Sequence, residues 1–344
     1  MIEFNKENYI KTAREIFSID SPTGYTAHVI DYIKKRAEKA GYACRIANKG
    51  TLEVRIDGRD DTRSVATSAH VDTLGLMVRS IKSDGTLALT KLGGPITATL
   101  DGEYCTIRTR GEKDFTGTIL STSPAVHVYP DANTLARDID HLIVRIDEKV
   151  STAREVRDLG IENGDLVFID PKFTLTESGF LKSRFIDDKA SVIALLLLID
   201  YLSEHRIVPR YRTFIYFSVY EEVGHGAASI DDSISEFVTC DMGCVGMDLS
   251  GNEYSVSICA KDSGGPYDYE LTGRLIALAQ KNDIRYTVDI FPFYGSDVGA
   301  AYRSGKDVKG ALIGTGVSAS HGMERTHEEG IVNTLKLLYA YLCE

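Results

Sequence analysis

A pair of glutamates at the end of an apolar segment is the strongest constraint on how this chain folds. Residues 211–219 (YRTFIYFSV) are rich in aromatic and β-branched side chains, which is typical of a buried central strand. Glu221 and Glu222 follow almost at once, and Gly224 then lets the backbone turn. Because burying an unpaired carboxylate costs several kcal/mol, the pair must either face water in a solvated loop or be matched by a proton or a cation.

Composition narrows the classes of function. The chain has 344 residues and a formal net charge of −11, which argues against a nucleic-acid partner bound through its phosphates. The longest apolar run, residues 190–199, is shorter than the roughly 20 residues that cross a bilayer, so we expect no membrane segment. The N-terminal segment predicts an amphipathic helix and not a signal peptide. Six cysteines without framework spacing indicate a reduced, cytoplasmic protein.

The pattern of short strands and helices changes twice along the chain. Helices alternate with apolar strands before residue 73 and after residue 172, which predicts an α/β sheet with ligands gathered at the carboxyl ends of its strands. We therefore expect one discontinuous domain made of residues 1–73 plus 172–344. Residues 74–171 form a β-rich insert, expected to be a small barrel. Its strands are predicted at 76–81, 86–91, 102–110, 116–120, 141–146 and 165–169, and its helices at 131–137 and 151–159.

Side chains that bind metals recur at five places along the chain. Histidine nitrogens and carboxylate oxygens together suit zinc, cobalt or manganese, and two such ions can hold a hydroxide and polarise a carbonyl. Each motif has a plainer explanation when taken alone, such as a helix cap, a turn residue or a surface loop. Their conjunction favours a metal site. The five places are His70 with Asp72, Asp187 with Asp188, Glu221 with Glu222, Asp248 after a strand expected at 243–247, and His321 with His327.

Six stretches in this order resemble the metallopeptidase 42 family of co-catalytic dinuclear aminopeptidases. They are SAHVDTLGLMV (68–78), FIDDKAS (185–191), YEEVGHGAA (220–228), GMDLS (246–250), GSDVGAAY (295–302) and ASHGMERTH (319–327). The resemblance implies a three-layer α/β/α catalytic domain that carries an inserted barrel-like domain. It also implies two divalent metal ions per chain, with zinc as the first choice and cobalt or manganese as alternatives.

The resemblance assigns a role to each matching residue. His70, Asp187, Glu222, Asp248 and His321 would be the metal ligands, with Asp187 bridging both ions. Glu221 would be the general base that takes a proton from the bridging water, and Asp72 would orient His70. Asp297 would support the substrate or the geometry of the site.

Two of these assignments have rivals, and two further residues depart from the family pattern. The segment before the closing ligand departs from the family's aromatic-Ile-His pattern, so His327 stays an alternative to His321. Asp241 is a weaker rival of Asp248. Lys189 stands where the family usually has arginine, and His225 is a local variant that we interpret as structural or near the site.

The function implied is hydrolysis of the N-terminal residue from short peptides. The family's insert mediates assembly, typically into a hollow dodecamer, so a homo-oligomer is expected. A dinuclear amidohydrolase or deacylase acting on a small N-acylated or dipeptide-like substrate is the main alternative. A catalytically inactive scaffold is a minor one. Glycosidase activity is disfavoured, because adjacent glutamates rarely lie roughly 5–9 Å apart across one sugar.

Overall fold

The computed structural model describes residues 2–344, and these divide into two compact units. The larger unit consists of residues up to Thr73 together with Phe173–Ser320 and Glu324–Glu344. The smaller unit consists of Leu74–Lys172 and His321–Met323. This division differs from the expected domain limits at Lys172 and at residues 321–323. No helix among residues 2–344 is long and apolar enough to cross a membrane.

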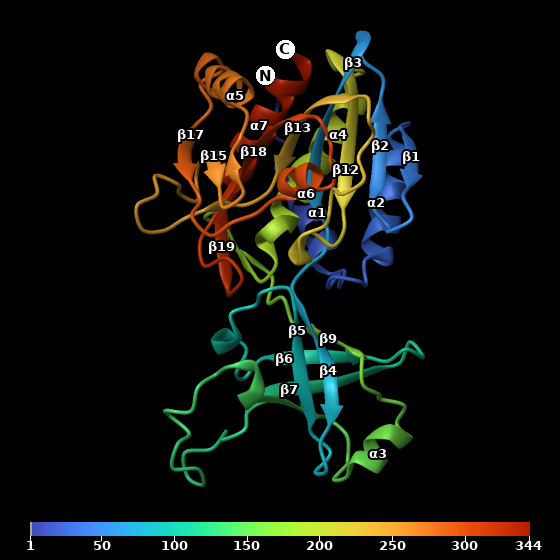
Figure 1. The fold of residues 1–344 in the computed structure, drawn as a ribbon, viewed down its shortest axis with the longest axis vertical. Coiled ribbons are helices and arrows are strands. Elements are labelled where there is room, and N and C mark those ends of the chain that lie inside the picture. The colour runs from blue at the N-terminus through green and yellow to red at the C-terminus, as the bar shows by residue number, and fades with distance from the viewer. Residues whose placement is uncertain (1) are drawn as a thin grey trace. The chain divides into compact units, whose positions relative to one another are not determined.

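The larger unit is built on a mixed sheet of ten strands (Figure 1). Its order is β1-β2-β12-β3-β13-β18-β15-β16, with β14 also paired to β18 and β17 also paired to β15. The strands are β1 (Ala43–Ile46), β2 (Leu52–Ile56), β3 (Asp60–His70), β12 (Tyr211–Ser218), β13 (Ile234–Cys240), β14 (Gly243–Cys244), β15 (Val256–Asp262), β16 (Gly265–Pro266), β17 (Tyr286–Ile290) and β18 (Lys309–Val317). A separate three-stranded sheet contains β10 (Thr174–Leu175), β11 (Phe180–Ser183) and β19 (Glu324–His327).

Both faces of the large sheet are buried, which makes three layers. Successive residues of a strand point to opposite faces, and in β12 Ile215 and Phe217 join one core while Phe214 and Tyr216 join the other. Five helices supply buried residues to the first core, and α6 supplies them to the second. The first five are α1 (Lys6–Phe17), α2 (Ala27–Lys39), α4 (Ile186–Glu204), α5 (Tyr269–Lys281) and α7 (Glu328–Cys343), and α6 covers Asp297–Arg303. The predicted α/β architecture is confirmed.

Three neighbouring strands in the middle of the sheet run in parallel. β12 and β13 flank β3, and Ser218 of β12 lies opposite His70 of β3. The carboxyl ends of parallel neighbours meet at one edge of a sheet, so the residues that follow these three strands are brought together. This arrangement positions the candidate site.

The smaller unit is a closed barrel with strand order β4-β5-β8-β7-β6-β9. The expected barrel is confirmed, although residues 131–137 are turns and not a helix. Arg137 explains this difference, because its guanidinium donates hydrogen bonds to the carbonyl oxygens of Ala132 and Leu135 and to Asp101. The elements are β4 (Gly75–Ile81), β5 (Leu87–Leu92), β6 (Tyr104–Arg108), β7 (Asp114–Ser121), β8 (Leu142–Ile146), β9 (Leu166–Ile169), α3 (Ala153–Asp158) and the short 3-10 turns Thr97–Thr99 and Ile139–His141.

A buried carboxylate near the start of β13 connects β3 to two helices. Glu236 on β13 accepts hydrogen bonds from Arg63 on β3 (2.5 Å), from Arg274 on α5 and from the hydroxyl of Tyr341 on α7 (3.2 Å). Burial alone would raise the pKa of Glu236, but hydrogen bonds and charge from Arg274 and Arg63 hold it below the ordinary value. The ionised form is therefore the one that stabilises the fold.

Glu236→Gln should reduce the free energy of unfolding by about 1–2 kcal/mol near neutral pH. A fully buried pair would lose more, but Arg63 and Arg274 are 34% and 45% exposed and solvent screens them. Folding lowers the pKa of Glu236 from its ordinary value near 4.5. The wild-type protein is therefore more stable than the variant above pH 4.5, and this difference in the free energy of unfolding shrinks as the pH falls below 4.5. Urea unfolding of both proteins between pH 7 and pH 4 checks this. A difference that stays constant over that range would contradict it.

Candidate metal centre

Three strand ends place acidic and imidazole side chains at one edge of the larger unit's sheet. His70 is the last residue of β3, and Asp241 directly follows β13. Glu221 and Glu222 form a 3-10 turn, η3 (Glu221–Val223), just after β12. Tyr220 precedes the turn in the left-handed conformation, with φ of 64°, which turns the chain away from the strand.

These side chains form two overlapping groups that could each hold a metal ion. One group contains His70, Glu221 and Asp241, and the other contains His70, Asp187 and Glu222. Within each group the ligand atoms lie within 4.8 Å of one another. The Nε2 atom of His70 is 3.0 Å from Oδ1 of Asp187 and 3.9 Å from Oε2 of Glu221. Nε2 of His70 is therefore surrounded by carboxylate oxygens that could join it in binding a cation.

Asp187 reaches the group from the beginning of α4. Its backbone, with φ of −71° and ψ of 104°, is not helical, and the regular part of the helix begins after Asp188. The backbone N–H of Asp187 donates to Oε2 of Glu324 at 3.0 Å, and Oδ2 of Asp188 accepts from the backbone N–H of His70 at 3.2 Å. The start of α4 is thereby fastened to the end of β3.

Asp72 positions His70, Glu221 and Glu222. The Nδ1 atom of His70 lies 2.8 Å from the backbone carbonyl oxygen of Asp72, an arrangement that leaves Nε2 facing the carboxylates. The Asp72 carboxylate accepts hydrogen bonds from the backbone N–H groups of Glu221 (3.1 Å) and Glu222 (3.3 Å) and from the hydroxyl of Thr23 (2.8 Å). One side chain therefore positions the turn that carries both glutamates.

The carboxylates of the site have raised pKa values, which a bound cation would lower. Burial and then the charge of Asp187 raise the pKa of Asp241 to about 7, and the same two causes raise that of Glu222. Burial also raises the pKa of Glu221, and Asp241 adds to this while His70 acts in the opposite direction. Carboxylates that raise one another's pKa are stabilised as anions by a bound divalent ion. The N/O donor set fits zinc, cobalt or manganese.

The structure places Asp248 apart from the two groups. Its side chain is exposed and belongs to neither group, whereas its rival Asp241 is buried in the first group. The strand expected at 243–247 is reduced to the two residues of β14, and the central strand is β13, which ends one residue before Asp241. The end of β13 therefore brings Asp241, and not Asp248, next to His70.

The two candidate closing histidines have different surroundings. His327 is buried, and its ring is engaged on both sides: Nε2 lies 2.8 Å from the carbonyl oxygen of Ser178, and Nδ1 accepts from the N–H of Glu329 at 3.2 Å. His321 belongs to the smaller unit, where Nδ1 lies 3.0 Å from the carbonyl oxygen of Gly94. Neither histidine is in the two groups formed by the described residues. The contacts of His327 give it a structural role, and the ligand role of His321 stays a prediction.

Asp297 stabilises the strands that carry the site. It begins α6 and is buried, and its carboxylate accepts hydrogen bonds from Ser68 of β3, Ser218 of β12 and the backbone N–H of Ala227. These bonds join the ends of the two strands that carry His70 and Glu221. The support of Asp187 by Glu324 carried no comparable signal in the sequence, because Glu324 lies in a segment that departs from the family pattern.

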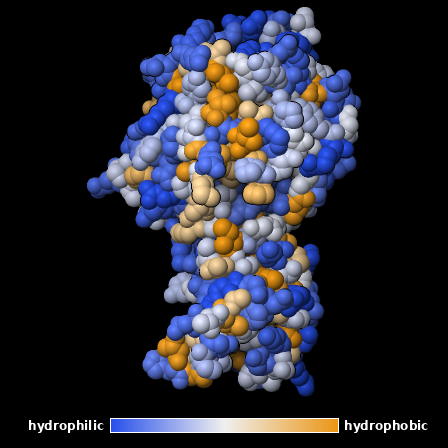
Figure 2. Space-filling view, turned by 60° about the vertical axis from the view of Figure 1, so that its left-hand side comes forward, coloured by the Kyte–Doolittle hydropathy of each residue, from blue (hydrophilic) through white to orange (hydrophobic). Residues whose placement is uncertain are grey.

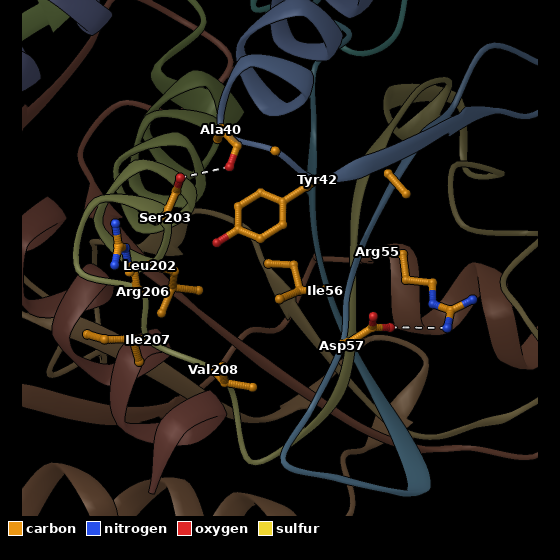
Figure 3. Close-up of a pocket in the computed structure, with 12 residues that line it drawn as sticks. Ala40, Tyr42, Arg55, Ile56, Asp57, Leu202, Ser203, Arg206, Ile207 and Val208 are labelled. Atoms are coloured by element: carbon orange, nitrogen blue, oxygen red, sulfur yellow. Dashed lines mark hydrogen bonds and ion pairs between the residues drawn. The ribbon is translucent and has the colours of Figure 1, made fainter.

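A cavity of about 550 Å³ lies at the other end of the same sheet (Figure 3). Residues after α2, at the end of β2 and after α4 line it, including Tyr42, Ile56 and Ile207. Two pairs of its lining residues bond to each other: Arg55 pairs with Asp57 at 3.1 Å, and Ser203 donates to the carbonyl oxygen of Ala40 at 2.7 Å. The cavity offers no reactive group comparable to those at the strand ends.

Comparison with known proteins identifies the family of this chain. The model of the family described as M42 glutamyl aminopeptidase matches residues 50–337. The chain belongs to this family. YhfE of Bacillus subtilis (strain 168), named as a candidate aminopeptidase, is 44% identical over 330 residues, which cover 96% of this chain and 95% of YhfE. This M42 chain is therefore a peptide-hydrolysing enzyme of a metal-dependent family.

Solved structures agree on the fold. Aminopeptidase APDkam598 from the archaeon Desulfurococcus kamchatkensis has a TM-score of 0.87 at 20% identity, over 98% of this chain and 95% of that one. The Pyrococcus horikoshii TET1 peptidase, described as assembling into a tetrahedron or a large octahedral shell, has a TM-score of 0.85 at 22% identity, over 98% and 99% of the two chains. At such identities the likeness establishes the shared fold.

Metal content should separate the candidate ligands. We expect Asp241→Asn to lose bound metal while Asp248→Asn retains it, because only Asp241 lies in a group of ligand atoms. His321→Ala should lose metal and His327→Ala should retain it, with a loss of stability from the missing cap of α7. Elemental analysis of the four purified proteins after dialysis makes the measurement. Full metal in Asp241→Asn, or in His321→Ala beside loss in His327→Ala, would refute the corresponding assignment.

Proposed function

We propose that this M42 chain is a dinuclear metal-dependent aminopeptidase that removes the N-terminal residue of short peptides. The observation that carries the proposal is the pair of overlapping ligand groups that share His70. Nε2 of His70 can bind only one ion, whereas a carboxylate can bind two. Asp187 would therefore be the residue that serves both ions, as the resemblance implies and co-catalytic hydrolysis requires. The proposed ligands are His70, Asp187, Glu222 and Asp241, with His321 as a further ligand predicted by the resemblance. Zinc is the first candidate ion, followed by cobalt and manganese.

Glu221 is the proposed general base. Bound divalent ions would polarise the scissile carbonyl and lower the pKa of a water molecule between them. The carboxylate of Glu221 accepts a proton from this water, and the water oxygen forms a bond to the carbonyl carbon. The C–N bond then breaks, and Glu221 returns the proton to the leaving amine. Asp72 keeps Glu221 in place through the bond from its backbone N–H.

Glu221→Gln should abolish turnover and retain bound metal. The amide keeps the size of the side chain but cannot accept the proton. Activity on a panel of aminoacyl anilides, measured with and without chelator and beside elemental analysis, checks this. We expect chelator-sensitive cleavage and about two ions per chain for wild-type protein.

Two results would count against the proposal. Unchanged turnover by Glu221→Gln would remove the base assignment. Bound metal without cleavage of any aminoacyl substrate, together with cleavage of an N-acylated or γ-linked dipeptide, would replace the aminopeptidase with an amidohydrolase.

The proposal includes assembly into a homo-oligomer. It is supported by the shell-forming TET1 peptidase of the same fold. The resemblance gives a role in assembly to residues 74–171, and the larger unit offers a second surface. Figure 2 shows apolar side chains on the face that comes forward from the left of Figure 1, where β17 lies. β17 pairs only with β15 among the described strands, and Ile290 on it and Phe293 after it are 56% and 97% exposed.

An open edge strand with apolar side chains is suited to pairing with the same strand of a second copy across a two-fold axis. Ile290→Lys should therefore shift the protein to smaller species in light scattering. Ile46→Lys is the matched control, because Ile46 is 47% exposed and lies on β1 at the opposite edge of the sheet. A monomeric wild-type protein would refute the assembly, and equal masses for wild type and Ile290→Lys would refute this surface.

We also propose that the enzyme acts in the cytoplasm. All six cysteines are free thiols in the structure, which is the usual state in a reducing compartment.

A further inference from the structure

The segment between β17 and α6 turns one aromatic side chain outward and the next one inward. Phe293 is exposed, whereas Tyr294 packs against residues of both cores of the larger unit. The hydroxyl of Tyr294 donates a hydrogen bond to the carbonyl oxygen of Met242 at 2.9 Å. Met242 directly follows Asp241, the ligand that closes the first group.

The position of Tyr294 is fixed from its own backbone. Its N–H donates to the hydroxyl oxygen of Ser263 at 2.9 Å, and the N–H of Ser263 donates to its carbonyl oxygen at 3.1 Å. The hydroxyl of Ser263 donates in turn to the carbonyl oxygen of Pro292 at 2.9 Å. The ring lies 5.1 Å from that of Phe291, at an angle of 55°. The orientation of the phenol is therefore set by contacts with Ser263 and Phe291.

The Asp241 carboxylate depends on the peptide that Tyr294 holds. Its Oδ1 accepts a hydrogen bond from the backbone N–H of Met242 at 2.6 Å, and Tyr294 binds the carbonyl oxygen of the same residue. Loss of the bond from Tyr294 would release this peptide, and with it the N–H group that holds the carboxylate.

We propose that Tyr294 is a positioning residue that holds Asp241 in place as a ligand of one of the two ions. This inference rests on the proposed function and adds a residue to it. Tyr294 acts on the group of His70, Glu221 and Asp241, whereas the group of His70, Asp187 and Glu222 has its own support from Glu324. Loss of the hydroxyl should therefore weaken the binding of one ion and spare the other.

Tyr267 provides a matched control. It is buried, and its hydroxyl donates to Oδ2 of Asp262 at 2.7 Å and lies 2.8 Å from the hydroxyl oxygen of Ser296. Its hydroxyl is bonded to the same 291–296 segment, but neither bonding partner is in the ligand groups. Tyr267→Phe and Tyr294→Phe each remove one buried hydroxyl from the same region, so both should lose similar stability.

The test is a zinc titration of wild type, Tyr294→Phe and Tyr267→Phe in competition with a chromophoric chelator. Loss of a residue that orients a ligand typically costs 10- to 100-fold in metal affinity. We expect such a loss for one of the two equivalents in Tyr294→Phe, with the other equivalent and both equivalents of Tyr267→Phe close to wild type. The visible absorption of the cobalt-loaded proteins should change for the same single equivalent, which a purely structural role would not produce.

The inference and the proposed function fail in different ways. Wild-type affinity for both equivalents in Tyr294→Phe, or an equal loss in both tyrosine variants, would overturn the role of Tyr294 alone. A wild-type chain that binds no zinc would overturn the metal centre itself. If Tyr294→Phe does not fold, Ser263→Ala, which removes the bond to the backbone N–H of Tyr294, should weaken the same equivalent, and unchanged zinc affinity would refute the role.

Discussion

Repulsion among buried carboxylates is the constraint on which the larger unit depends. Asp187, Glu221, Glu222 and Asp241 lie around one imidazole, and their burial raises the pKa of three of them. An arrangement of this kind is unfavourable unless the charges are balanced, so the surrounding hydrogen bonds hold the side chains where a cation can bind them. Asp72 fixes the glutamate turn, Glu324 fixes Asp187 and Asp297 joins the strand ends.

The sheet explains why those side chains come from distant parts of the sequence. β3, β12 and β13 are adjacent and parallel, so one residue at the end of each strand is enough to build the group. Such a site tolerates large changes elsewhere, because only the register of three strands and the start of α4 must be kept. The two solved structures at 20% and 22% identity share this fold.

The sequence predicted those parts of the fold that have a clear period or composition. The aromatic and β-branched run of β12 identified a central strand, and the alternation in the insert identified the six strands of the barrel. Residues 131–137 were expected to be a helix, but the side chain of Arg137 bonds to the carbonyl oxygen of Ala132, which such a helix would have used. Asp241 ranked below Asp248 because Cys240 and Asp241 separate two apolar segments, and nothing in the sequence shows where the strand between them ends. Tyr294 could not have been found at all, because its contact with Met242 joins two loops far apart in the chain.

The closure of the barrel has a consequence for how the catalytic sheet forms. β3 and β12 are parallel neighbours, yet roughly 140 residues separate them, and bringing them together costs chain entropy that grows with the length of the loop. Leu76 of β4 pairs with Val167 of β9, so the barrel joins its own two ends. Once it has folded, the effective loop between β3 and β12 shrinks to roughly a third, which lowers the entropic cost by about 1 kcal/mol. Early folding of the insert would therefore reduce the entropic barrier to pairing β3 with β12 in the sheet that carries the metal centre.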